Sequence, residues 1–323
     1  MTKQLVLIDG KNYAYRMHFV HRFLSSKGRC TSFLFGGLNS LVALARQLPE
    51  TAFVFVWDGA GETWRHRFSG GEYKAHRTNH GGDPKEDVAD LFPQLPIYQQ
   101  MWKRAGFRSF EIPGLECDDL IGMLATKAVK AEFFEKVIVH STDQDFYQLA
   151  TDKIGIMRGK KQGEANNRIM FAGQVAEEIE LHPKDWVKVR ALIGDPTDNI
   201  PHPLDGVGPK KAAKMIQEGL DPSKEWEKQD YRIKFNFSPV KSRWPIIRSN
   251  YVLSHILRNA ESEHLDDLTK QKVEVLLDGL SRKQFLREKS KLTDDGFEEF
   301  TNFCFEYDLA DIFASRVSIW KLP

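Results

Sequence analysis

The sequence predicts an α/β protein in which helices flank a mostly parallel, twisted central sheet. Three short apolar runs rich in Val, Ile and Phe predict buried strands at residues 4–8, 52–57 and 136–139. Longer runs with helical periodicity lie between them, at residues 33–48, 87–105 and 118–134. Because strands that alternate with helices usually pair in parallel, we expect a doubly wound sheet. Such sheets bind their ligands outside the carboxyl ends of the strands.

The composition limits the classes of protein to which this chain can belong. A chain of 323 residues, 41% hydrophobic and 28% charged, can bury a large core and predicts one large domain with a smaller one. No run approaches the roughly 18 apolar residues of a membrane span, so we expect a cytoplasmic protein that contacts no membrane. The net charge of +1 does not indicate a nucleic-acid partner by itself. Three cysteines far apart in the sequence, Cys30, Cys117 and Cys304, fit no zinc spacing and predict reduced thiols.

Acidic residues follow each predicted strand. Asp9 and Asp58 come directly after the first two strands, and Asp143 and Asp145 follow the third. The stretch 113–122, PGLECDDLIG, then places three more acids at the start of a helical pattern. Taken alone, this stretch fits a cation site about as well as a heavily capped helix, because helix N-termini favour acidic residues.

The second half of the chain is predicted to be helical from about residue 183. The stretch 194–201 carries the acid pair Asp195 and Asp198, three residues apart. Residues 184–218 then resemble a helix-hairpin-helix, in which glycines can adopt positive φ, let backbone N–H groups approach a phosphate, and stand beside lysines. The residues concerned are Gly206, Gly208, Lys210, Lys211 and Lys214. An ordinary turn between helices is the alternative.

Nine acids are thus expected at one edge of the sheet: Asp9, Asp58, Glu116, Asp118, Asp119, Asp143, Asp145, Asp195 and Asp198. Clustered carboxylates repel one another, and most would protonate unless cations neutralise them. Ligands that are all oxygen suit hard divalent ions such as Mg²⁺. Two such ions about 4 Å apart can activate a water molecule and stabilise the leaving oxygen of a phosphodiester.

These residues resemble the 5′-nuclease or flap endonuclease family, which includes the 5′-nuclease domain of bacterial DNA polymerase I and stand-alone phage enzymes. The matching segments occur in the family's order and spacing across roughly residues 4–216. They are residues 6–10, 56–59, 73–77, 113–119, 141–146, 194–201 and 206–212.

The resemblance implies an Mg²⁺-dependent enzyme with two metal ions, for which Mn²⁺ can substitute. It implies that Asp9, Asp58, Glu116, Asp118 and Asp119 surround the first ion. The other four acids would surround the second ion. The family's substrates are DNA with 5′ flaps, ends or junctions, and RNA primers in RNA–DNA hybrids. A replication polymerase and a single-strand-binding protein are the implied protein partners of a monomeric, stand-alone, phage-type enzyme in a bacterial or phage-infected cell.

The basic residues between about 60 and 92 correspond to the family's helical arch, under which a 5′ single strand passes. By this resemblance Lys74 and Arg77 share one face and meet the scissile phosphate. Tyr73 is expected to stack on a base or, alternatively, to pack its ring in the protein. Arg16 matches a phosphate-contacting arginine or is a surface ion-pair partner.

The chain departs from the family pattern at the hairpin, which is one residue longer and lacks its first glycine. The DNA contact and the potassium ion implied there are affected. We expect a nuclease domain at 1–182 and a helical DNA-binding domain at 183–323. Two alternatives remain, a PIN-type ribonuclease of related fold and a DNA-junction binding module without activity. The basic and aromatic stretch 226–244 fits a small hydrophobic subdomain as well as it fits a nucleic-acid surface.

Overall fold

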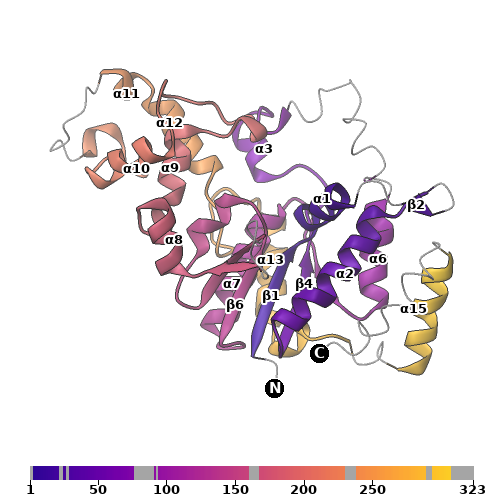
Figure 1. Cartoon of the computed structure of the whole chain (residues 1–323). Helices are drawn as coiled ribbons and strands as arrows, with labels where there is room; N and C mark the ends of the chain where they lie inside the picture. Colours follow the sequence, from indigo (N-terminus) through magenta and orange to yellow (C-terminus); the bar gives the residue numbers. More distant parts are fainter. Residues whose placement is uncertain are drawn as a thin grey trace.

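The computed structural model describes residues 3–21, 25–26, 29–75, 91, 94–159, 167–229, 238–288 and 293–306. It confirms the predicted α/β fold, with a central six-stranded sheet flanked by helices (Figure 1). The strand order is β5-β4-β1-β6-β7-β8, and every pair is parallel except β7 with β8. The strands are β1 (Gln4–Asp9), β4 (Thr51–Val56), β5 (Arg108–Phe110), β6 (Lys136–His140), β7 (Ile154–Arg158) and β8 (Arg168–Met170). A separate two-stranded hairpin pairs β2 (Ser25–Ser26) with β3 (Arg29–Cys30).

The three predicted strands are confirmed to within one residue at each end. They are the strands whose side chains are buried on both faces of the sheet, and this burial produces continuous apolar runs. Strands β5, β7 and β8 are not predicted from the sequence. These strands have three to five residues and contain Arg or Gly, so their sequences carry little strand signal.

Alternate residues of β1 pack into two separate cores. Leu5 and Leu7 face one core, and Val6 and Ile8 face the other. Helix α7 (Cys117–Lys130) covers the first face of the sheet. The second face is covered by α1 (Gly10–Val20), α2 (Ser32–Gln47), α6 (Leu95–Arg104) and α15 (Asp294–Glu306). The predicted helices at 33–48, 87–105 and 118–134 correspond to α2, α6 and α7, although residues 87–90, 92 and 93 lie outside the described part of the chain.

The rest of the described chain is helical, as predicted. Its helices are α8 (Ala172–Ile179), α9 (Trp186–Ile193), α10 (Pro209–Gln217), α11 (Ser238–Ser242), α12 (Trp244–Leu253), α13 (Asp267–Gly279) and α14 (Arg282–Phe285). Helices α9 to α12 gather on one side of the molecule, beyond the carboxyl ends of the strands (Figure 1). One continuous apolar core joins the sheet to Trp186, Ala212 and Trp244, so packing does not break at residue 182.

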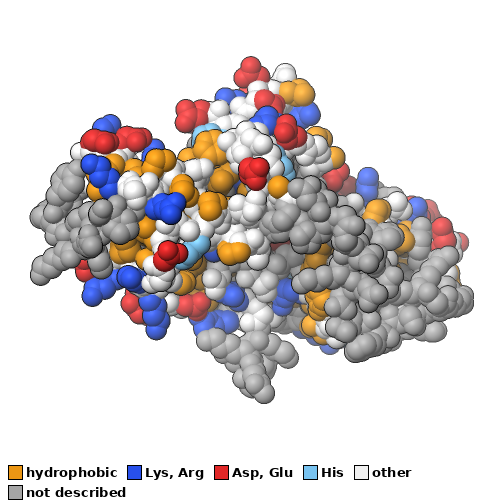
Figure 2. Space-filling view, turned by 90° about the horizontal axis from the view of Figure 1, so that it is seen from above, with side chains coloured by type: hydrophobic (Ala, Val, Ile, Leu, Met, Phe, Trp, Pro, Cys, Tyr) orange, Lys and Arg blue, Asp and Glu red, His pale blue; other side chains and the backbone are white. Residues whose placement is uncertain are grey.

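Cys117 and Cys304 are buried free thiols. Within the described residues, no helix is both long enough and apolar enough to cross a membrane. Seen from above, the described surface carries interspersed acidic and basic side chains rather than a field of one sign (Figure 2).

Candidate active site

The first acids lie at the carboxyl edge of the sheet, where β1 and β6 are neighbours. Asp9 ends β1 and caps α1, since its Oδ1 accepts a hydrogen bond from the Asn12 N–H at 3.0 Å. Its Oδ2 accepts from the Ser141 hydroxyl at 3.1 Å, just after β6. In the sheet, β4 lies beside β1 on one side and β7 lies beside β6 on the other. The strand order therefore reverses its direction between β1 and β6. A doubly wound sheet binds ligands at such a switch point.

Asp58 joins the end of β4 to the start of α7. Its Oδ1 accepts from the Cys117 N–H at 3.0 Å, and its Oδ2 lies 3.4 Å from the Lys11 ammonium. Glu116 is the N-cap residue of α7, and Asp118 and Asp119 lie in its first turn. The opening stretch of α7 is therefore a helix N-terminus, as its sequence predicts, and it faces the other acids across the strand ends.

A buried arginine, Arg65, lies among the acids of α7. It belongs to α3 (Trp64–Phe68), and its side chain is 1% exposed. Its Nη1 donates to Glu116 at 2.6 Å and to Asp119 at 2.8 Å, and its Nη2 donates to Asp119 at 3.0 Å. Asp118 Oδ2 lies 3.3 Å from Nη2. One internal cation thus contacts all three acids.

Lys74 and Tyr73 connect the acids of α7 to the second acid group. The Lys74 ammonium lies 2.8 Å from Glu116 Oε1 and 3.8 Å from Asp198 Oδ2. The Tyr73 hydroxyl donates to Glu116 at 3.3 Å and to Asp198 at 3.1 Å. The Tyr73 ring is 3% exposed, so this arrangement matches the packing alternative rather than stacking on a base.

The second group contains Asp143, Asp145, Asp195 and Asp198. Arg190 of α9 lies between two of these acids: its Nε is 2.6 Å from Asp145 Oδ1, and its Nη2 donates to Asp195. Asp195 also caps a short 3₁₀ helix, Pro196–Asp198, by accepting from the Thr197 N–H at 2.8 Å. All nine predicted acids therefore lie in one network, with a basic side chain in each half.

The pKa values of three carboxyl groups show excess negative charge. Burial, together with the Asp58 and Asp143 carboxylates, raises the pKa of Asp9 to about 7. Burial and the Asp143 carboxylate raise the pKa of Asp145 to about 8. Burial also raises the pKa of Asp118, as do the neighbouring carboxylates on α7. These groups would ionise more readily beside an added cation.

Glu116 behaves differently from these groups. Burial alone would raise its pKa, but the Arg65 guanidinium and the Lys74 ammonium overcome that cost and lower the pKa to about 2. Glu116 is therefore ionised at any ordinary pH.

The acids fit a hard divalent cation by their chemistry, because they supply only oxygen ligands in a region of excess negative charge. Within the described ranges, no three His, Cys, Asp or Glu side chains converge closely enough to hold a metal ion in this conformation. The internal cations explain this, since Arg65, Lys74, Lys11 and Arg190 draw the carboxylates toward themselves.

The residues predicted to contact DNA lie on α1 and at the start of α10. Arg16 is on α1, where its Nη2 is close to Gly159 and its Nη1 has no hydrogen-bond partner among the described residues. The predicted helix-hairpin-helix corresponds to α9 and α10, which pack together. Pro209 begins α10, as expected, and Lys210 and Lys211 are exposed.

The prediction for the hairpin glycines is correct for one of the two. Gly206 has φ +68°, whereas Gly208 has φ −88° and ψ 179°, which is extended backbone that any residue adopts. Gly208 is the N-cap of α10, and this position requires extended rather than left-handed backbone. No atom of the described residues lies within 4 Å of a Cβ built on either glycine, so both backbones are open to a ligand.

Arg77, the second predicted catalytic residue, lies outside the described residues, as does most of the predicted arch. Arg65 and Arg190 are not among the site residues predicted from the sequence. Each follows an apolar residue in a helical pattern, and nothing in the local sequence distinguishes it from a surface arginine. The signal that could have found them is the excess of carboxylates, which requires buried counter-charges.

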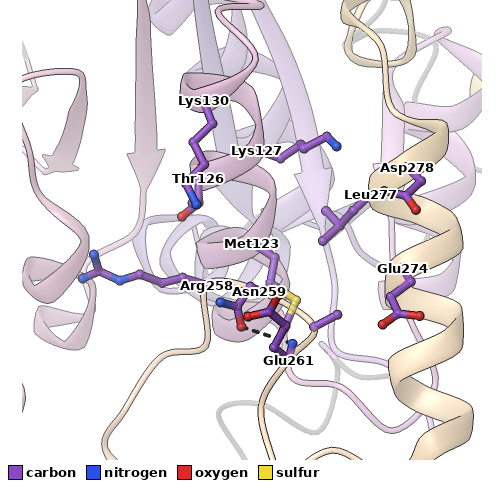
Figure 3. Close-up of a pocket in the computed structure, with 11 residues that line it drawn as sticks. Met123, Thr126, Lys127, Lys130, Arg258, Asn259, Glu261, Glu274, Leu277 and Asp278 are labelled. Carbon is purple, nitrogen blue, oxygen red and sulfur yellow. Dashed lines mark hydrogen bonds between the residues drawn. The ribbon is translucent and has the colours of Figure 1, made fainter.

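A shallow hollow of about 220 Å³ lies elsewhere, between the second half of α7 and α13 (Figure 3). Lys127 and Lys130 line one wall, and Glu274 and Asp278 line the other. None of the nine acids lines it. This hollow is therefore separate from the acids at the N-terminal end of α7.

The mostly parallel α/β sheet with acids at its carboxyl edge is the arrangement expected for the 5′–3′ exonuclease class, and comparison with known proteins shows the family. Residues 4–180 match the family model of the 5′-3′ exonuclease N-terminal resolvase-like domain. The chain therefore belongs to the 5′–3′ exonuclease family, a family of phosphodiester hydrolases.

Among curated proteins, the chain is 31% identical over 230 residues to a 5′-3′ exonuclease of Aquifex aeolicus, covering 70% of this chain and 74% of that protein. It is 35% identical over 216 residues to DNA polymerase I of Deinococcus radiodurans, covering 66% of this chain and 21% of the polymerase. It is 30% identical to the thermostable DNA polymerase I of Thermus thermophilus, covering 67% of this chain and 24% of the polymerase. The match thus spans about a quarter or less of these polymerases.

Among solved structures, the fold is similar to that of T5 5′-exonuclease with bound zinc. The TM-score is 0.60 at 18% identity, covering 94% of this chain and 99% of the other. A T5 D15 flap endonuclease in complex with DNA and metal ions also has a TM-score of 0.60, at 19% identity, covering 96% and 99% of the two chains. At these identities the likeness shows the fold, including the helical half of the chain.

Proposed function

We propose that the chain is a Mg²⁺-dependent 5′→3′ exonuclease and flap endonuclease that acts on branched or 5′-ended DNA. The observation that carries the proposal is the network of nine carboxylates at the carboxyl edge of the sheet, with Lys74 between its two halves. Family membership supports the reaction class. The names of two relatives, a 5′-3′ exonuclease and a flap endonuclease crystallised with DNA and metal ions, support the substrate class and the metal requirement.

Two divalent ions bound by these acids would supply Lewis-acid stabilisation for in-line hydrolysis of a phosphodiester. Asp9, Asp58, Glu116 and Asp118 would hold the first ion; the fifth expected ligand, Asp119, is fully buried and bonds to Arg65 and Trp64. Asp143, Asp145, Asp195 and Asp198 would hold the second. Mn²⁺ should substitute for Mg²⁺ because it accepts the same oxygen ligands.

Lys74 and the hairpin act on different parts of the substrate. The Lys74 ammonium lies between Glu116 and Asp198, where it can stabilise charge that develops on the phosphoryl oxygens. Arg77 would act beside it. The open backbones of Gly206 and Gly208, with Lys210 and Lys211, would hold the phosphates of the duplex. A potassium ion at this hairpin and contacts of Arg16 with DNA belong to the same proposal.

Removal of RNA primers from RNA–DNA hybrids belongs to the same proposal, since the in-line reaction at phosphorus makes no use of the sugar 2′ position. We also propose that the functional boundary between the nuclease part and the DNA-binding part lies near residue 182, before α9 and the hairpin, and that one apolar core continues across it.

The test is cleavage of a 5′-labelled flap DNA with Mg²⁺ and with excess chelator. We expect cleavage near the junction only with Mg²⁺, while binding to the flap DNA stays measurable in chelator because the lysines supply the grip. Asp143→Asn is the matched inactive control. Cleavage that persists in excess chelator would contradict the two-metal proposal. Preference for single-stranded RNA over flap DNA would favour a ribonuclease instead.

A further inference from the structure

Arg65 has five N–H groups, and all five have acceptors. Three of these hydrogen bonds go to Glu116 and Asp119: Nη1 donates to Glu116 and Asp119, and Nη2 donates to Asp119. A longer contact of 3.5 Å joins Nη1 to Asp118 Oδ1. The other two go to backbone carbonyls, from Nε to Leu253 at 2.9 Å and from Nη2 to His255 at 2.8 Å. The guanidinium is therefore fully used inside the protein.

Asp119 is saturated in the same way. A carboxylate accepts about four hydrogen bonds, two at each oxygen. Its Oδ2 accepts from Arg65 Nη1 and from Trp64 Nε1 at 2.7 Å, and its Oδ1 accepts from Arg65 Nη2 and from the Leu257 N–H at 2.9 Å. The side chain is fully buried. All four acceptor positions are filled, which leaves none for a metal ion.

We propose that Asp119 and Arg65 are a positioning pair, and that Asp119 is not the metal ligand that its place in the sequence predicts. The pair fixes the first turn of α7, and with it Glu116 and Asp118, relative to the base of the predicted arch. The inference rests on the proposed function, since it assigns roles within that site.

The other half of this arrangement is the segment 253–257, which follows α12. Each of its five residues forms a backbone hydrogen bond with a side chain on one of two sides. Arg65 donates to the carbonyls of Leu253 and His255, and Asp119 accepts from the Leu257 N–H. Gln148 donates to Ser254 at 3.0 Å and accepts from Ile256 at 3.0 Å.

Gln148 lies in the 3₁₀ helix that follows Asp143, Gln144–Leu149. The segment 253–257 is thus hydrogen-bonded to Arg65 and Asp119 beside the first acid group, and to Gln148 beside the second. Helix α7 approaches it closely at Gly122, where a Cβ would lie 2.4 Å from the Leu257 carbonyl oxygen. The segment lies outside residues 4–180, which the family model matches. A segment of the C-terminal third of the chain therefore helps to position the acids of the site.

The decisive comparison is Asp119→Asn with Asp118→Asn, because both remove one negative charge from the same helical turn. Mn²⁺ binding is measured by calorimetry without DNA, and the single-turnover rate is measured at saturating Mg²⁺ and flap DNA, well below the melting temperature. We expect Asp118→Asn to weaken Mn²⁺ binding at least ~10-fold and to keep the melting temperature. Asp119→Asn should change Mn²⁺ affinity by less than ~3-fold, lower the melting temperature by roughly 5–10 °C and slow the rate ~10–100-fold.

Arg65→Gln and the double variant Arg65→Gln/Asp119→Asn test whether the two residues act together. If they act as one pair, the double variant should be no slower than Arg65→Gln by more than ~2-fold, because the second change removes an interaction that is already lost. Arg104→Gln in α6 is the control. Its guanidinium forms an exposed ion pair with Glu299 at 2.7 Å, so its loss should leave rate and stability nearly unchanged.

Three results would overturn the proposal. The first is a loss of Mn²⁺ affinity in Asp119→Asn equal to that in Asp118→Asn, which would make Asp119 a ligand. The second is a normal saturated rate in a destabilised Asp119→Asn, which would make the pair merely structural. The third is additive losses in the double variant; if Arg65→Gln does not fold, Asp119→Asn alone decides. Failure of the wild-type chain to cleave DNA would contradict the proposed function, while Mn²⁺ binding and melting would still test the assignment of Asp119.

Discussion

The backbone N–H of Lys74 donates to the carbonyl oxygen of Asp198 at 2.9 Å, which ties the base of the predicted arch to the second acid group. The side-chain amide of Asn199 donates to the Glu72 carbonyl at 2.7 Å beside it. Lys74 has φ +57°, a left-handed conformation that is unfavourable for a residue with a side chain. The two bonds hold this conformation, and the ammonium then reaches Glu116 at 2.8 Å.

This geometry predicts that Lys74 acts on the reaction more than on affinity. In Lys74→Ala we expect the single-turnover rate to fall by ~10²–10³, which is typical of losing one electrostatic stabiliser of a transition state. The dissociation constant for flap DNA should change little, because other basic groups hold the substrate. Rapid-quench kinetics at saturating enzyme, with a separate binding titration, measures both. Weaker binding with an intact saturated rate would make Lys74 an ordinary phosphate contact.

A second prediction concerns pH and follows from Asp9 and Asp145, whose pKa values are raised to about 7 and about 8. A carboxyl group with a raised folded-state pKa stabilises the fold fully below its unfolded value, near 3.8, and loses that contribution as pH rises through the folded-state pKa. The metal-free protein should therefore lose stability between about pH 5 and pH 8. Glu116 has the opposite sign, but its stabilisation is lost only below about pH 4, as its pKa of about 2 is approached.

Thermal melts in chelator across that range provide the measurement. We expect the melting temperature to fall by several degrees from pH 5.5 to pH 8, at ~2–4 °C per kcal/mol, and Mg²⁺ to reverse much of the fall by neutralising the carboxylates. Asp9→Asn should flatten the profile. A metal-free melting temperature that rises toward pH 8 would mean that Asp9 and Asp145 are not desolvated as the structure places them.

The fold could be predicted from the sequence wherever a buried strand or helix is long enough to give a clear apolar pattern. Three strands, β1, β4 and β6, are buried along nearly their whole length, and helix α7 is buried over most of its residues. Their long apolar patterns identify them. Strand β8 has three residues and pairs antiparallel at the sheet edge, where neighbouring strands rather than its own sequence determine its conformation.

The candidate site likewise has one part that the sequence predicts and one part that it does not. Most of its acids are predictable because they follow a strand or begin a helix, and parallel strands bring the strand ends to one edge. The partners of those acids are not predictable in this way. Arg65 reaches Leu253 and His255, 188 and 190 residues away in sequence, so no local pattern records the contact. The buried state of Tyr73 likewise depends on Asp198, 125 residues away.

A third prediction concerns Asp143, for which the structure shows no ion pair among the described residues. Burial raises the pKa of Asp143, and so do the carboxylates of Asp198 and Asp195. Asp143→Asn removes one of several repelling charges, so the metal-free melting temperature should hold or rise. The stabilisation that Mg²⁺ adds should shrink, and turnover should fall severely. Melts with and without Mg²⁺ measure the first two effects; a large metal-free drop would indicate a structural role.

A fourth prediction concerns Gly59, next to Asp58. A Cβ at this position would lie 1.7 Å from the Ile112 carbonyl oxygen, which is backbone and cannot move aside cheaply. Gly59→Ala should therefore cost more than ~2 kcal/mol of stability and displace Asp58 from the Cys117 N–H. The matched control is Gly173→Ala in α8, where nothing lies within 4 Å, and it should be neutral or stabilising by up to ~1 kcal/mol. Equal denaturation midpoints for the two variants would contradict the contact.

The last prediction concerns the hairpin, where the exposed Lys210 and Lys211 follow the open backbones of Gly206 and Gly208. If these lysines contact duplex phosphates, their charge contributes through release of counterions, and each lost contact should reduce the slope of log affinity against log salt by about 1. Lys210→Ala and Lys211→Ala should weaken flap-DNA binding most at low salt, while the single-turnover rate of the bound complex stays near that of the wild type. Lys214→Ala, one turn further along α10, is the neighbouring comparison. Binding titrations at four salt concentrations, paired with saturated rates, separate this behaviour from that of Lys74→Ala. An unchanged salt slope in both hairpin variants would remove the hairpin from the DNA interface and leave α9 and α10 as an ordinary helical pair.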